Sequence, residues 1–140
     1  MTDTYSISTD KSKLDIERIH AFLSNESYWA KGRSPNRVKN SIENSLCFGL
    51  YKNGHVLIGF ARVVTDKTVF AFLMDVFILR EYRGRGFGKM LMEHVLNYPE
   101  LKTVRWLLGT EDARDFYSRL GFENARNPKK YMSRPASAED

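Results

Sequence analysis

Apolar residues recur along the first half of the chain with two periods, one typical of strands and one of helices. The predicted elements are a strand at 5–8, a helix at 15–24, a helix at 34–45 and the two strands of a hairpin at 46–51 and 55–64. Ser34 followed by Pro35 favours a helix start, because serine caps the N-terminus and proline suits the first helical position. Asn53-Gly54 favours the hairpin, because both residue types accept the positive φ of a tight turn.

The second half alternates between strands and helices. The predicted elements are a strand at 69–79, a helix at 88–99, a strand at 103–110, a helix at 111–122 and one further short strand at 129–134. Residues 69–79 are apolar on both faces, as a central buried strand requires. Gly121 is the expected end of the last helix, because glycine readily adopts the left-handed conformation found there.

This order of elements predicts a single α/β domain. A chain of 140 residues, 42% of them apolar, is long enough to bury a core of its own. We expect the domain to span residues 1–135. Residues 136–140 are small and polar, so we expect a disordered tail there.

Charge and cysteine content narrow the class of protein. The chain carries 22 Lys and Arg against 17 Asp and Glu, a net charge of +5, which attracts anions without forming long basic blocks. Cys47 is the only cysteine and the three histidines are dispersed, so we expect no disulfide and no metal site. The chain shows neither an apolar signal core nor a run of about 18 to 20 apolar residues. We therefore expect a cytoplasmic protein that does not enter a membrane.

Glycines and cations alternate in the segment EYRGRGFGKMLM, residues 81–92. The segment follows the predicted central strand and opens a helix, where free N–H groups and the helix dipole favour an anion. Glycines let a ligand approach the backbone, cations supply donors beside it, and Phe87 is expected to turn inward as an anchor. A merely solvated turn is the alternative. The predicted anion-binding loop comprises Arg83, Gly84, Arg85, Gly86, Phe87, Gly88 and Lys89.

Three known nucleotide- or RNA-binding motifs do not fit this loop. A Walker loop needs Ser or Thr after Gly-Lys, where Met90 stands. A dinucleotide fingerprint needs glycine at the position of Lys89 and lies in the first strand-helix unit. The RNA-recognition signature belongs on a strand and has aromatic residues at the positions of Lys89 and Met92. The loop therefore predicts a different phosphate-bearing ligand.

One family pattern matches. Arg83-x-x-Gly86-x-Gly88 resembles the R/Q-x-x-G-x-G/A signature of the GNAT superfamily of acyl-CoA-dependent N-acyltransferases, in which this loop holds the CoA pyrophosphate. Residues 113–122 (ARDFYSRLGF) resemble the family's later A-x-x-F-Y-x-x-x-G-F helix. The resemblance covers about residues 46 to 133, and the first 45 residues fit in element order only. It implies a mixed, mostly antiparallel central sheet flanked by helices, with a splayed central strand pair, and acetyl-CoA as co-substrate.

The resemblance also implies where acetyl-CoA lies. The pantetheine arm is expected along the strand DVFIL, at a bulge where two strands splay apart. A main-chain N–H at the bulge would stabilise the oxyanion, and by position we assign this region to Phe77, with Val76 and Ile78 as neighbours. The family often has asparagine where this chain has Thr110, so Thr110 is either a CoA contact or a helix cap.

Two residues are candidates for proton transfer. Tyr117 matches the family's tyrosine that reaches the thioester sulfur, where a phenol can donate a proton to the departing thiolate. A core aromatic is the alternative. Asp75 is a carboxylate in an apolar strand, which is costly without a partner and typical of functional sites. It is either the base that deprotonates the amine or the partner of an arginine.

Glu26, Tyr28 and Trp29 lie in the segment that borders the acceptor site in this family. An acidic group beside aromatic rings suits a cationic amine. Packing of the first helix is the alternative explanation for the two aromatic residues.

Together these features predict an N-acetyltransferase that moves an acetyl group from acetyl-CoA to a primary amine of a small molecule or peptide. The expected mechanism is direct attack in a ternary complex. A non-catalytic acyl-CoA-binding module of the same fold is the first alternative, and a basic nucleic-acid-binding domain is the second. Since the segment after Phe122 is short, one closing strand is either irregular or supplied by a partner copy in a homodimer.

Overall fold

The computed structural model describes residues 2–137, which contain five strands, four α-helices and short 3₁₀ turns. In chain order the elements are β1 (Tyr5–Ser8), α1 (Ile16–Glu26), α2 (Pro35–Glu43), β2 (Leu46–Lys52), β3 (Val56–Thr65), β4 (Phe70–Ile78), α3 (Phe87–Leu96), β5 (Arg105–Leu108) and α4 (Arg114–Ser118). Residues 138–140 of the predicted tail lie outside the described residues. Within residues 2–137, no helix is long and apolar enough to cross a membrane.

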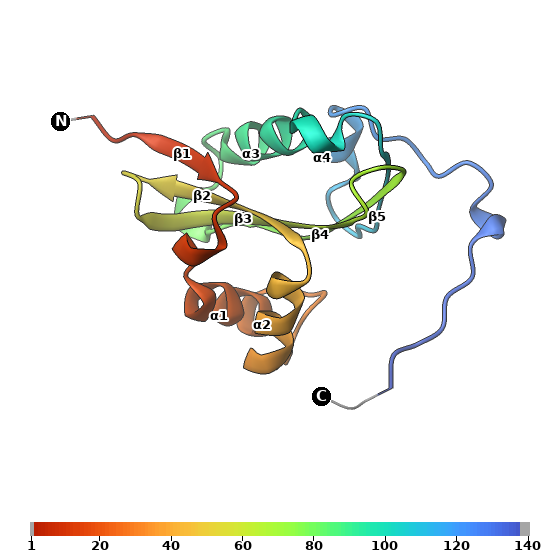
Figure 1. Cartoon of the computed structure of the whole chain (residues 1–140), viewed down its shortest axis with the longest axis horizontal. Helices are drawn as coiled ribbons and strands as arrows, with labels where there is room; N and C mark the ends of the chain where they lie inside the picture. The colour runs from red at the N-terminus through yellow and green to blue at the C-terminus, as the bar shows by residue number, and fades with distance from the viewer. Residues whose placement is uncertain (1, 138–140) are drawn as a thin grey trace.

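The strands form one sheet in the order β1-β2-β3-β4-β5. Every neighbouring pair of the described strands is antiparallel except β4 and β5, which run parallel. Helices α1 and α2 cover one face of the sheet, and α3 and α4 cover the other (Figure 1). This arrangement confirms the predicted mixed, mostly antiparallel sheet flanked by helices.

Local signals in the sequence explain where several elements begin and turn. The Ser34 side chain accepts a hydrogen bond from the backbone N–H of Arg37 at 3.2 Å, with Pro35 at the first helical position of α2. The turn between β2 and β3 has Asn53 at φ 54° and Gly54 at φ 78°. Both predictions, the serine cap and the Asn-Gly hairpin turn, are confirmed.

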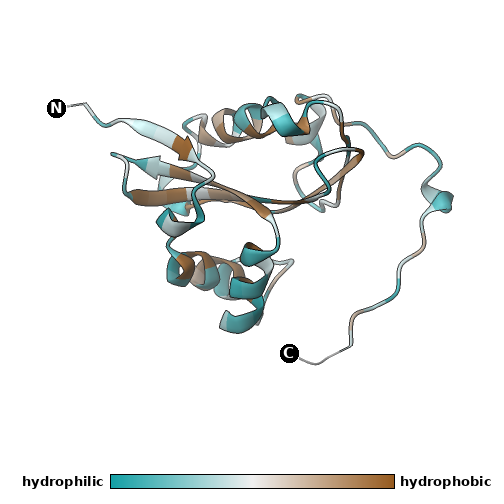
Figure 2. Ribbon diagram, in the orientation of Figure 1, coloured by the Kyte–Doolittle hydropathy of each residue, from teal (hydrophilic) through white to brown (hydrophobic). Residues whose placement is uncertain are grey.

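The apolar core has two parts, one on each face of the sheet. In Figure 2 the hydrophobic colouring follows the strands and the helix surfaces turned toward them. On the α1–α2 face, Phe22 stacks on Phe77 with 4.1 Å between ring centroids. On the α3 face, Leu91 and Val95 are fully buried and belong to the same cluster as Leu73 of β4. Strand β4 therefore contributes to both parts, as a central strand should.

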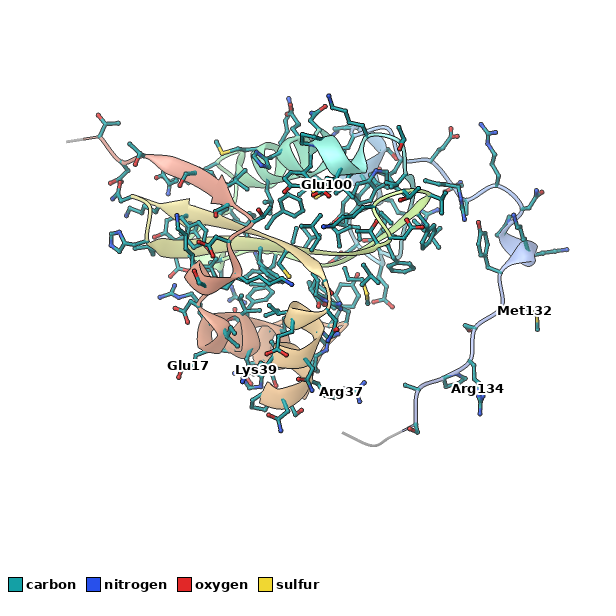
Figure 3. The ribbon with its side chains drawn as sticks, in the orientation of Figure 1. Glu17, Arg37, Lys39, Glu100, Met132 and Arg134 are labelled. Carbon is teal, nitrogen blue, oxygen red and sulfur yellow. The ribbon has the colours of Figure 1, made fainter. Side chains whose placement is uncertain are left out.

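The end of the chain departs from the predicted pattern. Helix α4 is shorter than the predicted helix at 111–122, although Gly121 ends its last turn with φ 97° as expected. The predicted strand at 129–134 is wrong, because Pro128–Lys130 form a 3₁₀ turn and no strand follows it within the described residues. Figure 3 shows Met132 and Arg134 projecting from an extended segment away from the sheet. Proline lacks the N–H that a ladder needs, which disfavours pairing at this point.

Candidate active site

The loop between β4 and α3 depends on glycine for its shape. After the 3₁₀ turn Arg80–Tyr82, Gly84 and Gly86 adopt left-handed φ angles of 74° and 85°, and Gly86 is the N-cap of α3. Residues with a Cβ atom rarely adopt such angles. A Cβ atom added at either glycine would meet no other atom within 4 Å. The backbone conformation, and not crowding by the rest of the protein, therefore requires these glycines.

The backbone amides of this loop are not used inside the protein. Among residues 2–137, no hydrogen bond is donated by the backbone N–H of any residue from Gly84 to Lys89. The Met90 N–H donates to the Gly86 carbonyl oxygen at 3.1 Å and so begins the helical ladder. A run of free N–H groups at the positive end of a helix dipole favours a bound anion, and phosphate in particular.

Arg83 and Phe87 hold the loop against the protein. Arg83 donates from Nε to the carbonyl oxygen of Ile78 at 2.9 Å, and its guanidinium lies 5.8 Å from the ring centroid of Phe22. Phe87 is 6% exposed and packs against Tyr5 with 4.5 Å between ring centroids. The loop is therefore fixed at both ends while its amides make no hydrogen bond to the described residues.

Arg85 and Lys89 place two further positive charges beside these amides, and both side chains are exposed. The Arg85 guanidinium donates to the Tyr5 hydroxyl at 3.3 Å, and the Lys89 ammonium lies 3.9 Å from the Glu93 carboxylate. Contacts of this kind between exposed groups contribute little to stability. Both cations can therefore turn toward an anionic ligand at small cost.

Strand β4 is irregular close to this loop. Leu73 lies in the core on the α3 face, whereas Phe77, four residues later, lies in the core on the α1 face. Residues four apart in a regular strand share a face, so an extra residue must stand between them. The pairing of β3 with β4 shifts at the same point, and Asp75 has a φ of 55° there. These observations define a β-bulge at Asp75.

The pairing of β4 with β5 stops just before the bulge. The last paired residues are Leu73 and Leu108, whereas β4 continues to Ile78. Among the described strands, none pairs with this stretch of β4 on the side of β5. The predicted splay between two central strands is thus present, and it leaves an edge of β4 open.

The backbone direction of β4 decides which residues face this open edge. Leu79 N donates to the Ile58 carbonyl oxygen of β3 at 2.8 Å. Because backbone groups alternate along an extended chain, Phe77 also directs its N–H and C=O toward β3. Val76 and Ile78 direct theirs toward the open edge. Of the three residues predicted for the oxyanion region, Val76 and Ile78 have backbone groups at the open edge. The backbone of Phe77 faces β3, and its ring packs in the core.

Tyr117 is partly buried in α4 between Phe116 and Phe122, at centroid distances of 5.0 Å and 5.8 Å. Its hydroxyl makes no hydrogen bond with any residue that the structure describes. Burial raises the pKa of Tyr117 to about 12, and the nearby acidic groups of Tyr28 and Asp112 add to the shift. The phenol is therefore protonated at neutral pH and has its proton free to donate.

The segment between α1 and α2 reaches the residues that precede α4. Tyr28 is 44% exposed, and its hydroxyl accepts a hydrogen bond from the Glu111 backbone N–H at 2.9 Å. Trp29 packs edge-on against Tyr28 with 5.1 Å between ring centroids. Glu26 lies 3.6 Å from Arg80, which begins the turn after β4. The structure thus places the aromatic pair near α4 and Glu26 near the start of the glycine loop.

Thr110 and a neighbouring cavity lie next to Tyr117. The Thr110 hydroxyl accepts a hydrogen bond from the Ala113 N–H at 3.0 Å, but Ala113 and not Thr110 is the N-cap residue of α4. A cavity of about 1020 Å³ lies between β5, α4 and residues 122–131, with Thr110 and Tyr117 on its wall. None of the loop residues 83–89 lines it. We centre the candidate site on the loop and the open edge of β4, because the free amides lie outside this cavity.

Asp75 is buried and paired on both oxygens. Its Oδ2 accepts hydrogen bonds from Arg62 Nε and from Arg33 Nη1, each at 2.8 Å, and its Oδ1 accepts one from Trp29 Nε1 at 2.9 Å. The Asp75 side chain is 1% exposed. Arg62 also donates to the Ser45 hydroxyl at 3.0 Å. Of the two alternatives for Asp75, the structure shows the arginine pairing.

Arg33 and Arg62 are the residues that the sequence analysis missed. Arg62 stands within the apolar run HVLIGFARVV, and a buried guanidinium needs an acidic partner, so its position was a usable signal. Arg33 lies in a polar segment and carried no comparable signal. No cluster of three or more His, Cys, Asp or Glu residues that could hold a metal occurs in residues 2–137.

Known acetyltransferases resemble this chain in sequence and in fold. A family model described as the acetyltransferase (GNAT) domain matches residues 43–124. A crystal structure of a GNAT-family protein from Xanthomonas campestris pv. campestris is 42% identical with a TM-score of 0.91, covering 95% of this chain and 94% of that one. The [ribosomal protein bS18]-alanine N-acetyltransferase of Haemophilus influenzae is 30% identical, over 96% of this chain and 93% of its own length.

A more distant structure shares the fold alone. N-acetylglutamate synthase from Neisseria gonorrhoeae, complexed with coenzyme A and N-acetyl-glutamate, is 20% identical with a TM-score of 0.72. The likeness covers 88% of this chain and 29% of that chain.

Proposed function

Because this chain belongs to the GNAT acetyltransferase family, we propose that it transfers an acetyl group from acetyl-CoA to a primary amine. The amine attacks the thioester directly within a ternary complex. The observation that carries the proposal is the run of free backbone amides from Gly84 to Lys89 at the N-terminus of α3, beside the open edge of β4.

In this proposal the loop binds the diphosphate of acetyl-CoA. The free amides donate to the phosphate oxygens, and the dipole of α3 favours their negative charge. Arg85 and Lys89 add charge-assisted contacts from the surface, which are stronger than bonds between neutral groups. Arg83 acts differently, because its bond to the Ile78 carbonyl oxygen holds the loop in position.

The open edge of β4 receives the pantetheine arm, which adds to the sheet as an extended chain would. Val76 and Ile78 supply the backbone groups at this edge. In place of Phe77, whose backbone groups face β3, we assign the oxyanion-stabilising N–H to one of these two neighbours. Phe77 supports them from the core by stacking on Phe22.

Tyr117 is the proposed acid. The amine nitrogen attacks the carbonyl carbon, the C–S bond breaks, and the Tyr117 hydroxyl gives its proton to the departing sulfur. The nitrogen loses a proton as the amide forms, and this proton restores the phenol. Burial raises the pKa of Tyr117 to about 12, which makes the phenol a weaker donor but favours its return to the neutral form after each transfer.

The acceptor amine must lose one proton before it can attack, because its pKa in solution is about 10. Asp75 was the first candidate base. Both of its oxygens already accept hydrogen bonds from Trp29, Arg33 and Arg62, so we propose that water on the acceptor side takes this proton instead.

The exposed aromatic pair, Tyr28 and Trp29, forms one wall of the proposed acceptor site, and Glu26 supplies negative charge at its rim. Aromatic faces and a carboxylate both attract an ammonium group. Because the Haemophilus influenzae relative is named for an alanine of ribosomal protein bS18, the alanine amine of a peptide is the first acceptor to test.

Calorimetry with acetyl-CoA, followed by measurement of free thiol released in the presence of an amine panel, tests this function. We expect saturable binding and thiol release that depends on the amine. Binding without thiol release across a broad panel would favour the non-catalytic module. Tight nucleic-acid binding that weakens steeply with salt, and that CoA does not displace, would favour the second alternative.

A further inference from the structure

We infer that Asp75 is a positioning residue that joins the acceptor wall to the β4 bulge. Its three hydrogen-bond donors come from two parts of the chain: Trp29 and Arg33 from the segment between α1 and α2, and Arg62 from β3. This inference rests on the proposed acetyl transfer. It assigns Asp75 to the geometry of the reaction and not to a proton-transfer step.

The position of Asp75 makes it suitable for this role. It occupies the bulge itself and directly precedes Val76, whose backbone faces the open edge of β4. One of its oxygens accepts from the indole of Trp29, which belongs to the proposed acceptor wall. The Asp75 side chain thus fixes the distance between the proposed acceptor wall, which meets the amine, and β4, which meets the thioester.

The charges around Asp75 favour a role in positioning over a role in proton transfer. The side chains of Arg33 and Arg62 are 19% and 8% exposed, so two largely buried guanidinium groups pair with one carboxylate. Loss of the negative charge would leave both cations without their partner, and an unpaired buried charge is strongly unfavourable. A base needs a lone pair that is free to accept a proton in every cycle, whereas both oxygens of this carboxylate already accept hydrogen bonds from three donors.

The backbone at the bulge explains why the residue is aspartate. The φ of 55° is uncommon for residues with a Cβ atom, and Asp and Asn tolerate it better than most. The short side chain then satisfies two needs at once, the conformation of the bulge and the three hydrogen bonds. For the same reason Asp75→Asn removes the charge while it preserves the backbone preference, and so it is the variant of choice.

The first experiment does not depend on catalysis. The chain has two tryptophans, so Trp106→Phe leaves Trp29 as the only one. In that background we expect Asp75→Asn to shift the Trp29 emission to longer wavelength and to lower its anisotropy. The one oxygen of asparagine stays with the two arginines, so its NH₂ group, which cannot accept a hydrogen bond, faces the indole N–H. Arg18→Gln is the control, since the ion pair of Arg18 with Asp15 is exposed on α1. It should leave the emission unchanged.

The second experiment measures kinetics with the best amine from the panel. We expect Asp75→Asn and Trp29→Phe each to lower kcat/KM for the amine by roughly tenfold to a hundredfold, mainly through KM, with the Kd of acetyl-CoA unchanged. The double variant should be no worse than Asp75→Asn alone, because both changes break the same contact. The decrease in kcat/KM toward acid pH should persist in Asp75→Asn, in Trp29→Phe and in the double variant.

A different set of results would overturn the inference. If Asp75 is the base, Asp75→Asn will abolish the decrease in kcat/KM toward acid pH, while Trp29→Phe changes the rate little and the Trp29 emission stays as in the parent. Should Asp75→Asn fail to fold, Arg33→Gln replaces it in the emission experiment and Trp29→Phe with Arg33→Gln replace it in the kinetics, since both residues lie partly exposed. A wild-type chain that acetylates no amine would sink the proposed function, while the emission data would still decide whether Asp75 holds Trp29.

Discussion

The two sides of the β4 bulge differ in whether their polar groups have hydrogen-bond partners within the protein. On the side of the glycine loop, the amides from Gly84 to Lys89 have no partner among the described residues. On the acceptor side, the Asp75 carboxylate has three partners and is almost completely buried. Exposed N–H groups at a helix N-terminus can stay with solvent until a ligand binds, whereas a buried charge must be paired within the protein. In the proposed function, the first side receives ligand atoms and the second keeps its shape.

Tyr117→Phe should produce the largest effect, because it acts on the chemical step between the two sides. We expect kcat to fall by about a hundredfold or more, since general acid catalysis usually contributes at least that much. The affinity for acetyl-CoA, measured by calorimetry, should not change. Tyr98→Phe is the matched control, because Tyr98 packs against Phe48 on the α3 face, away from the reacting groups. A Tyr117→Phe enzyme with nearly normal kcat would remove Tyr117 from the mechanism.

Gly86→Val tests the loop side of the comparison. Valine is strained at φ 85°, at a cost of about 1 to 3 kcal/mol, so the loop should change shape and bind acetyl-CoA roughly tenfold more weakly or worse. Gly54→Val is the control with almost the same strain, because Gly54 has φ 78° in the β2–β3 turn. We expect both variants to lose similar stability and only Gly86→Val to lose affinity. Equal affinities would show that the loop conformation does not matter for binding.

Alkaline pH tests the buried phenols that flank both sides of the sheet. Burial raises the pKa of Tyr117 and of Tyr51 from 10.0 to about 12 in the folded protein. The unfolded chain therefore loses these protons first, so stability is fully present below pH 10 and falls as the pH rises to 12. Urea unfolding at several pH values should show this fall, and either Tyr→Phe variant should reduce it. A midpoint that is constant up to pH 12 would contradict the shifts.

Tyr51→Phe should give the smallest effect, and its sign is opposite to that of most core substitutions. The Tyr51 hydroxyl is buried without a hydrogen-bond partner among the described residues, unlike the paired carboxylate of Asp75. Because an unsatisfied buried polar group is costly, its removal should stabilise the protein by about 1 kcal/mol at pH 7. Thermal and urea unfolding measure this gain. A clear loss of stability would mean that the hydroxyl has a partner in solution, such as a bound water.

The two sides also differ in how far the sequence predicted them. The glycine loop is a local motif, so the spacing of Gly84, Gly86 and Gly88 after an apolar strand was enough to predict a loop with free amides at a helix start. All five strands, both early helices and the order of these elements along the chain followed from local periodicity in the same way. Features defined within about ten residues could therefore be predicted.

The acceptor side could not be predicted to the same depth, because its contacts join distant parts of the chain. Nothing local relates Asp75 to Arg33 or Arg62, and the side chains that meet there come from a loop, β3 and β4. The bulge was implied by the family resemblance alone, because the β4 sequence is apolar on both faces, which hides a change of face. The predicted strand at 129–134 is wrong for a related reason. Tyr131 and Met132 can form a strand only beside a neighbouring strand that pairs with them.

Amide hydrogen exchange by NMR tests the central claim most directly. We expect the amides from Gly84 to Lys89 to exchange quickly in the free protein and to be slowed strongly by saturating acetyl-CoA. Acetyl-pantetheine, which carries the thioester without the diphosphate, should slow those of Val76 or Ile78 and leave the loop unprotected. If saturating acetyl-CoA leaves exchange from Gly84 to Lys89 unchanged, these amides do not hold the diphosphate and the account is wrong.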